Sequence, residues 1–200
     1  VAALERAAPV YRPRWGTEHD RANRAWIATV RPMVKKFAGT LANQIASAYH
    51  TSWPSSLLRV DVVSYASWAG AYTTLDPNRI TISNNDPRQE GYAAFETLFH
   101  ESSHVLIDVV RNAIARECQA QNKAVPRDLW HAMLFYTTGE LVRKRLAQQG
   151  VSNYVPYAYK NGLFTRAWPQ FIRPLEQHWQ AYLDGRTDFD SALKKVVAEI

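Results

Sequence analysis

The middle of the chain contains the stretch Leu98–Ile107, with the sequence LFHESSHVLI. It belongs to a longer segment, residues 92–119, whose apolar residues recur at helical spacing, and we expect one helix there. Histidines four residues apart lie on one face of a helix, so His100 and His104 can both reach a single metal ion. Glu101 projects about 100° around the helix axis from His100. Its carboxylate can therefore meet a water molecule held by that metal.

The chemistry of this stretch follows from its residue types. A bound metal lowers the pKa of water, and a neighbouring carboxylate takes the proton as the water attacks a carbonyl. Apolar residues flank the motif on both sides, and buried histidines need partners, which a metal supplies. The sequence therefore predicts one Zn²⁺ per chain, bound by His100 and His104, with Glu101 as the general base.

A catalytic zinc usually takes three protein ligands and leaves one position for water. The next predicted helix, residues 126–150, offers His131 and Glu140. Nine residues separate the two, which is about 180° around a helix, so they cannot both face the metal. Glu140 is preferred, because glycine and glutamate are unusual inside an otherwise apolar helix. Metal ligation would explain the presence of Gly139 and Glu140 there. His131 is the alternative third ligand; it is also explicable as an oxyanion donor or as a core histidine.

The segments around this pair of helices predict the rest of the architecture. Residues 17–50 show helical periodicity, and Pro32 is expected to kink or divide that helix. Residues 58–65, 71–75 and 79–83 have the alternating, β-branched pattern of strands, and the turn residues 76–78 predict a hairpin between the last two. A loop is expected at 153–162, followed by helices at 169–183 and 188–200. The order predicts an α+β fold, mainly helical, with a small antiparallel sheet before the metal-binding helix.

We expect a single domain of 200 residues with four parts: a helical part (1–56), the small sheet (57–86), two metal-binding helices (87–150) and a helical C-terminal part (151–200). The composition, 46% hydrophobic and 21% charged, is that of a packed globular protein and excludes a disordered chain. No apolar run is long enough for a membrane-spanning helix. The net charge of +6 is dispersed along the chain, which favours solvated helix faces over a nucleic-acid patch.

The arrangement of His100, Glu101 and His104, followed 36 residues later by Glu140, resembles the gluzincin class of zinc metallopeptidases, which includes the thermolysin-like and aminopeptidase-like enzymes. The resemblance implies that His100, His104 and Glu140 bind zinc and that Glu101 is the general base. Such enzymes commonly steady the oxyanion with a tyrosine or histidine that follows the glutamate helix. Tyr157, held by the preceding proline, is the candidate here.

The chain as a whole resembles a group of compact bacterial gluzincin-like proteins that are usually exported. This resemblance implies a periplasmic or secreted protein, and the single cysteine and the start at Val1 favour the same compartment. The predicted partner is a peptide or protein substrate, which the strand at 79–83 is expected to bind as an added strand. The alternative is a non-catalytic binding or scaffold protein that retains the zinc site. A third hypothesis, a basic nucleic-acid binder, is disfavoured by the dispersed charge.

Overall fold

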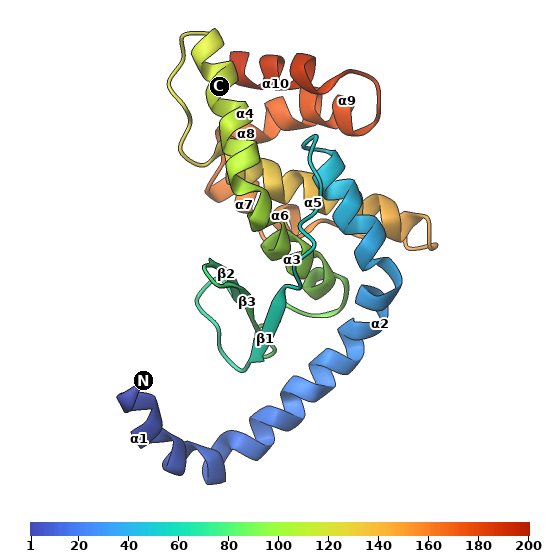
Figure 1. Cartoon of the computed structure of the whole chain (residues 1–200). Helices are drawn as coiled ribbons and strands as arrows, with labels where there is room; N and C mark the ends of the chain where they lie inside the picture. The colour runs from blue at the N-terminus through green and yellow to red at the C-terminus, as the bar shows by residue number, and fades with distance from the viewer.

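The structure is a computed structural model that describes residues 1–200 (Figure 1). The N-terminal part consists of α1 (Ala2–Tyr11), a π-helical segment (Arg12–Gly16), α2 (Thr17–Ser47), β1 (Arg59–Val63), β2 (Ala71–Leu75) and β3 (Asn78–Ser83). The middle consists of α3 (Gly91–Ser103), a 3-10 segment (His104–Leu106), α4 (Ile107–Ala120) and α5 (Leu129–Ala147). The C-terminal part consists of α6 (Tyr157–Lys160), α7 (Leu163–Arg166), α8 (Pro169–Pro174), a second π-helical segment (Leu175–Trp179), α9 (Gln180–Leu183) and α10 (Phe189–Ala198). The predicted α+β class, mainly helical with a small sheet before the histidine-bearing helix, is confirmed.

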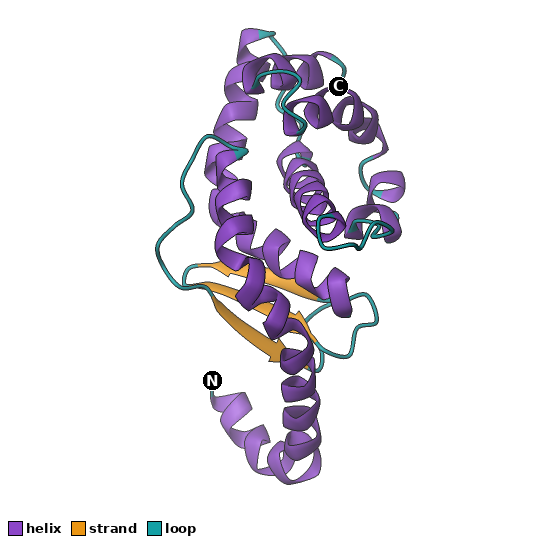
Figure 2. Cartoon of the chain, turned by 90° about the vertical axis from the view of Figure 1, so that its right-hand side faces the viewer, coloured by secondary structure: helices purple, strands orange, loops and turns teal.

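The sheet and the C-terminal helices lie on opposite sides of α3, and the first part of α2 runs past the sheet (Figures 1 and 2). α1 and the start of α2 extend from the rest of the molecule, and no side chain before Val30 is buried. Further along α2, Leu41 and Ile45 are fully buried against the core. The helix predicted at 17–50 is confirmed as α2, which continues through Pro32 without being divided.

The sheet has the strand order β1-β3-β2 and is mixed, not purely antiparallel as predicted. The predicted hairpin is confirmed, since β2 and β3 pair antiparallel. β1, however, pairs in parallel with the far side of β3. Ile80 and Ile82 of β3 are fully buried and pack against Ala94 and Leu98 of α3, so the central strand is also the most buried one.

The helix predicted at 92–119 is interrupted at its centre. α3 ends at Ser103, the residues His104–Leu106 form a 3-10 turn, and α4 then begins. Two serine hydroxyls bond back to carbonyls of the preceding turn, from Ser102 Oγ to Leu98 O and from Ser103 Oγ to His100 O, each at 2.6 Å. Such back-bonding competes with the regular helical ladder and bends helices. The break therefore falls at His104, the second histidine of the predicted metal-binding motif.

α5 is the central helix of the larger core. Every residue from Ala132 to Glu140 is buried, and the helix packs against α2, α3 and α6. The residues expected as a loop at 153–162 contain the short helix α6. The predicted C-terminal helices are confirmed, as three consecutive helical segments over Pro169–Leu183 and as α10, where Asp188 accepts a capping hydrogen bond from Ser191 N at 2.8 Å. None of the helices combines the length and the apolar composition needed to cross a membrane.

Candidate metal centre

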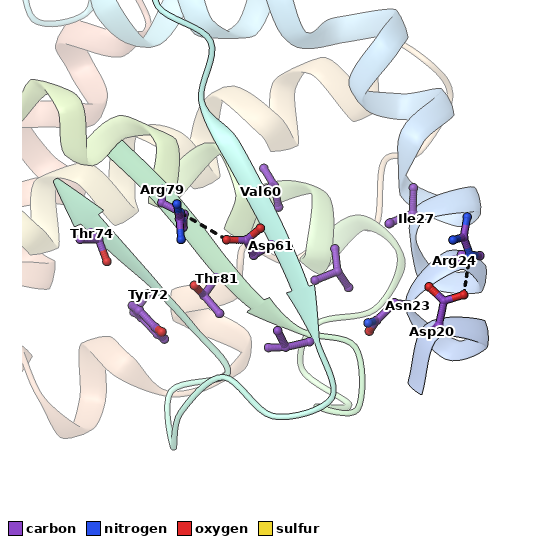
Figure 3. A pocket seen from close by; sticks show the side chains of 12 residues that line it. Asp20, Asn23, Arg24, Ile27, Val60, Asp61, Tyr72, Thr74, Arg79 and Thr81 are labelled. Carbon is purple, nitrogen blue, oxygen red and sulfur yellow. Dashed lines mark hydrogen bonds and ion pairs between the residues drawn. The ribbon is translucent and has the colours of Figure 1, made fainter. Parts of the chain in front are cut away.

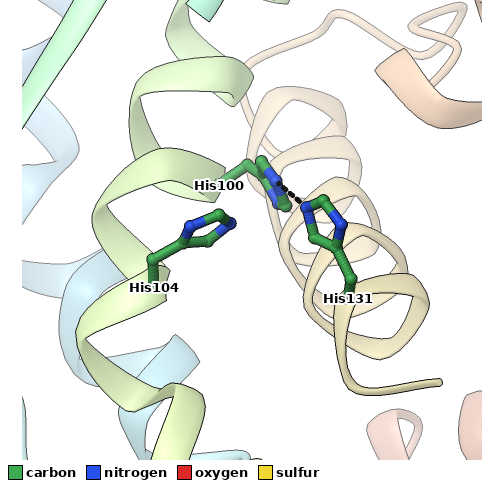
Figure 4. A group of neighbouring side chains, drawn as sticks. All are labelled: His100, His104 and His131. Atoms are coloured by element: carbon green, nitrogen blue, oxygen red, sulfur yellow. Dashed lines mark hydrogen bonds between the residues drawn. The ribbon is translucent and has the colours of Figure 1, made fainter. Parts of the chain in front are cut away.

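Three histidines from two helices converge on one point (Figure 4). His100 lies in the last turn of α3, His104 begins the 3-10 turn that follows, and His131 lies in the first turn of α5. One ring nitrogen from each histidine lies within 4.8 Å of the others. His100 is buried, whereas His104 and His131 are half-buried. The cluster is therefore closed around His100 and more open at His104 and His131.

The spacing of the nitrogens suits a metal ion. His100 Nε2 and His131 Nε2 are 3.2 Å apart. Two nitrogens bound to one tetrahedral zinc at about 2.0–2.1 Å lie about 3.3–3.4 Å from each other. His104 Nε2 is buried and has no hydrogen-bond partner in the protein. A buried nitrogen without a partner is costly, and coordination of a metal would satisfy it.

The three imidazoles are held in the neutral form that a metal ligand requires. Burial lowers the pKa of His131 to about 3 and that of His104 to about 4. Burial also lowers the pKa of His100 well below its usual value, and the charges of the other two histidines add to this effect. At neutral pH the three imidazoles are therefore uncharged, and a metal ion would replace the hydrogen bond that joins His100 Nε2 to His131 Nε2.

Glu101 is held by the neighbouring edge strand. Thr73 in β2 places its hydroxyl 2.6 Å from Glu101 Oε2 and 2.9 Å from Glu101 O. Burial raises the pKa of Glu101 to about 7, while the hydrogen bond from Thr73 opposes that rise. A carboxyl group that titrates near neutral pH is suited to taking up and releasing a proton.

Aromatic rings enclose the histidines. The ring of His100 lies flat on Phe135, with centroids 3.3 Å apart and an angle of 17° between the planes. His131 stacks on Trp130 at 4.7 Å and meets the edge of Trp168 at 5.2 Å. These contacts fix the orientation of the imidazoles and limit the access of water, which strengthens electrostatic interactions inside the site.

The structure does not bring Glu140, the preferred third ligand, to the histidines; it brings the alternative, His131. Glu140 accepts two hydrogen bonds from Arg143, at 2.9 Å and 2.6 Å, and this ion pair accounts for its burial. His131 and Glu140 lie half a turn apart on α5, so the face that presents His131 to α3 turns Glu140 away. The preference for Glu140 is thereby corrected by the geometry of α5.

The neighbouring glycine has a packing role instead. A Cβ atom on Gly139 would lie 2.8 Å from Pro156 Cβ and 3.1 Å from Glu96 Oε1. The absence of a side chain lets the segment before α6 approach α5 closely. Glu96 is completely buried at this contact, where it accepts hydrogen bonds from Tyr154 Oη at 2.6 Å and from Tyr157 N at 3.0 Å. The Gly139–Glu140 pair thus reflects packing and an ion pair rather than metal ligation.

Glu96 is expected to make stability depend on pH. Burial raises its pKa to about 7, the two hydrogen bonds oppose the rise, and the charge of Glu140 adds to it. Between pH 4.5 and 7 the unfolded chain loses this proton while the folded chain keeps it, so the free energy of unfolding falls as pH rises. The loss is on the order of 3 kcal/mol by pH 8. Urea unfolding of the metal-free parent chain and of a Glu96 variant at pH 5 and pH 8 isolates this contribution, because Glu101 and the buried histidines also titrate over this range.

The Glu96→Gln variant removes the titrating group and keeps an oxygen that can accept the same hydrogen bonds. The stability of Glu96→Gln relative to the parent chain is therefore expected to rise from pH 5 to pH 8. Glu5→Gln, at an exposed position in α1, is the matched control. Its free energy of unfolding relative to the parent chain should be the same at pH 5 and pH 8. An equal difference at both pH values for Glu96→Gln would contradict the prediction.

Tyr157, the predicted oxyanion donor, begins α6 and is buried near the cluster. Its ring lies parallel to Phe135 at a centroid distance of 6.1 Å, and Phe135 in turn stacks on His100. Burial raises the pKa of its phenol, so the group remains a hydrogen-bond donor at neutral pH. Gln89 Nε2 lies 3.5 Å from its hydroxyl. Tyr157 is thus separated from the nearest histidine by one aromatic ring.

A cavity of about 690 Å³ lies apart from the histidines, on the other face of the sheet (Figure 3). It is bounded by the exposed start of α2 and by side chains such as Asp61, Tyr72 and Thr81. Thr81 alternates with Ile80 and Ile82, which face α3, so this cavity and the histidine cluster lie on opposite sides of the sheet. Its charged groups pair with each other, Arg24 with Asp20 at 2.7 Å and Arg79 with Asp61 at 3.4 Å.

Sequence reasoning missed Thr73, Phe135 and Trp130 as parts of the site. Thr73 has the β-branched character of an ordinary strand residue, and the aromatic residues have the character of ordinary core residues. The only signal was that Trp130 directly precedes a candidate ligand. Comparisons with protein-family models, with curated proteins and with solved structures found no match for this chain.

Proposed function

We propose that the chain is a zinc-dependent peptide hydrolase whose metal is held by His100, His104 and His131. The observation that carries the proposal is the convergence of three imidazole nitrogens within 4.8 Å of one another, from a motif in which the buried carboxyl group of Glu101 directly follows His100. A zinc ion with three protein ligands supplies a Lewis acid that polarises a carbonyl and lowers the pKa of water. The motif of His100, Glu101 and His104 is still that of a zinc-peptidase helix, but the third ligand is a histidine and not the glutamate on which the resemblance to the gluzincins rested.

Glu101 would act as the general base and then as the general acid. Its oxygen accepts a proton from the attacking water and delivers it to the amine that leaves, so the carboxyl group ends in its starting state. Thr73 would hold the carboxylate in place, since its hydroxyl donates to Oε2. Tyr157, whose phenol stays protonated at neutral pH, is the candidate donor to the oxyanion, and its hydroxyl would have to reach past Phe135 to act.

The substrate would add to β2 rather than to the strand at 79–83. β3 is central and paired on both sides, so only β1 and β2 have free edges. Ser83 N donates to Gly70 O at 2.8 Å, and bonded pairs alternate along an antiparallel ladder. With the observed register, the backbone groups of Ala71, Thr73 and Leu75 point away from β3. An extended peptide on this edge would lie beside the residue that holds Glu101.

A cleavage assay tests the proposal. The zinc-loaded protein is incubated with a quenched peptide library, and products are identified by mass spectrometry before chelation, after chelation and after zinc is restored. Cleavage that is lost and regained with the metal is the expected result. One zinc per chain without any cleavage would contradict the proposal and favour the alternative, a binding or scaffold protein that retains the zinc site.

A further inference from the structure

The arginine Arg111 lies on the aromatic wall of the histidine cluster. Its guanidinium carbon is 4.6 Å from the ring centroid of Trp130. The same indole stacks on His131 and meets the edge of His104 at 5.8 Å. A positive charge is therefore held on the ring that borders two of the three candidate ligands.

This guanidinium has no anionic partner within the chain. Arg111 is exposed, and no carboxylate oxygen lies within 4.0 Å of it, although Asp108 is one turn earlier on α4. A guanidinium stacked on an aromatic ring uses its face, and its N–H groups stay free along its edge. That edge has the geometry to bind a carboxylate through two parallel hydrogen bonds.

Arg111 also lies on the accessible side of the cluster. His100 is 1% exposed, whereas His104, His131 and Trp130 are half-buried. The more exposed part of the cluster, at His104 and His131, is therefore next to the indole that carries Arg111. An extended peptide advances about 3.3–3.6 Å per residue, so a group one or two residues from the reacting carbonyl could reach a cation on that ring.

We propose that Arg111 selects substrates that present a carboxylate one or two residues from the cleaved bond. The inference rests on the proposed peptide hydrolysis and adds the substrate class. The carboxylate is either an acidic side chain or the carboxyl terminus of the peptide. Trp130 positions the guanidinium, and the ion pair forms outside the metal coordination sphere.

The experiment compares three forms of the zinc-loaded protein: the parent chain, Arg111→Gln and Arg116→Gln. Arg116 is exposed on the same helix and forms no ion pair, so its replacement changes the net charge equally. The substrates are matched quenched peptides with Glu or Gln beside the cleaved bond, each as a free acid and as an amide. We expect Arg111→Gln to lower kcat/KM about 10- to 100-fold on substrates with the recognised carboxylate, and Arg116→Gln to leave it unchanged.

Two further measurements separate the outcomes. Arg111→Lys keeps the charge without the bidentate edge and should recover only part of the loss. Fluorescence anisotropy of the same peptides, labelled and bound to Glu101→Gln protein with and without Arg111→Gln, should show the same preference without turnover. The Glu/Gln pair and the acid/amide pair identify which carboxylate is recognised.

Each negative result has its own meaning. If the zinc-loaded parent chain cleaves none of these peptides or the library, the proposed hydrolysis fails. If it cleaves the peptides without preference for a carboxylate, or if Arg111→Gln and Arg116→Gln behave alike, hydrolysis stands and the role of Arg111 is overturned.

Discussion

Replacing His131 with alanine is expected to lower the zinc affinity of the chain by more than about 100-fold. His131 Nε2 lies 3.2 Å from His100 Nε2 and provides one of only three nitrogens that converge on the site. Loss of an outer partner of a metal ligand already costs 10- to 100-fold in affinity, so loss of a ligand itself costs more. Competition with a chromophoric chelator measures the change, and mass spectrometry gives the zinc content.

Glu140→Gln is the matched control on the same helix. Glu140 lies in its ion pair with Arg143 and outside the histidine cluster, so the variant should keep its zinc. Urea unfolding of both metal-free variants checks that each one folds. The opposite pattern, with zinc lost in Glu140→Gln and kept in His131→Ala, would require α5 to be rotated by half a turn from the orientation described above.

Replacing Glu101 with glutamine is expected to lower kcat by about 10²- to 10⁴-fold while zinc stays bound. Glutamine has the same shape and can still accept the hydrogen bond from Thr73, but it cannot take up the proton of the attacking water. Because the lost interaction acts in the transition state, KM should change little. Steady-state kinetics on a cleaved library peptide, with zinc content measured in parallel, tests this.

Glu117→Gln controls for the loss of a carboxylate outside the site. Glu117 lies on α4, where its side chain accepts a hydrogen bond from Gln121, and its replacement should leave kcat unchanged. If Glu101→Gln retained the full rate, the proton would have to be transferred by another group and the assignment of the general base would be wrong.

The sequence predicted the elements whose pattern is local. α2 has a long apolar stripe, the hairpin of β2 and β3 has a turn cluster at its centre, and the pair His100 and His104 has the spacing of one helical turn. Each of these signals lies within one segment of the chain. For that reason composition and periodicity were sufficient to find them.

The features that were missed depend on contacts between segments. The nine-residue spacing on α5 showed that only one of His131 and Glu140 could face the metal, but the choice depends on how α5 packs against α3. β1 pairs with the edge of β3 that β2 does not occupy, and the alternation of polar and apolar residues in the two strands does not predict which strands pair. The hydrogen bonds from Ser102 and Ser103 to the preceding turn are local, but serine also occurs in helices that are not interrupted. The two serines therefore did not predict the break.

The packing of His100 on Phe135 has a consequence for how the ion would enter. In most metal sites the second nitrogen of a ligating histidine donates a hydrogen bond that fixes the ring, but His100 Nδ1 is buried without any such partner. Its ring is instead fixed by packing in the apolar core, where its centroid lies 3.3 Å from the centroid of the Phe135 ring. The conformational entropy of the His100 side chain is therefore lost when the protein folds and not when a metal binds. An incoming ion would find a preorganised receptor and need not fold the chain around itself, in contrast to a zinc finger.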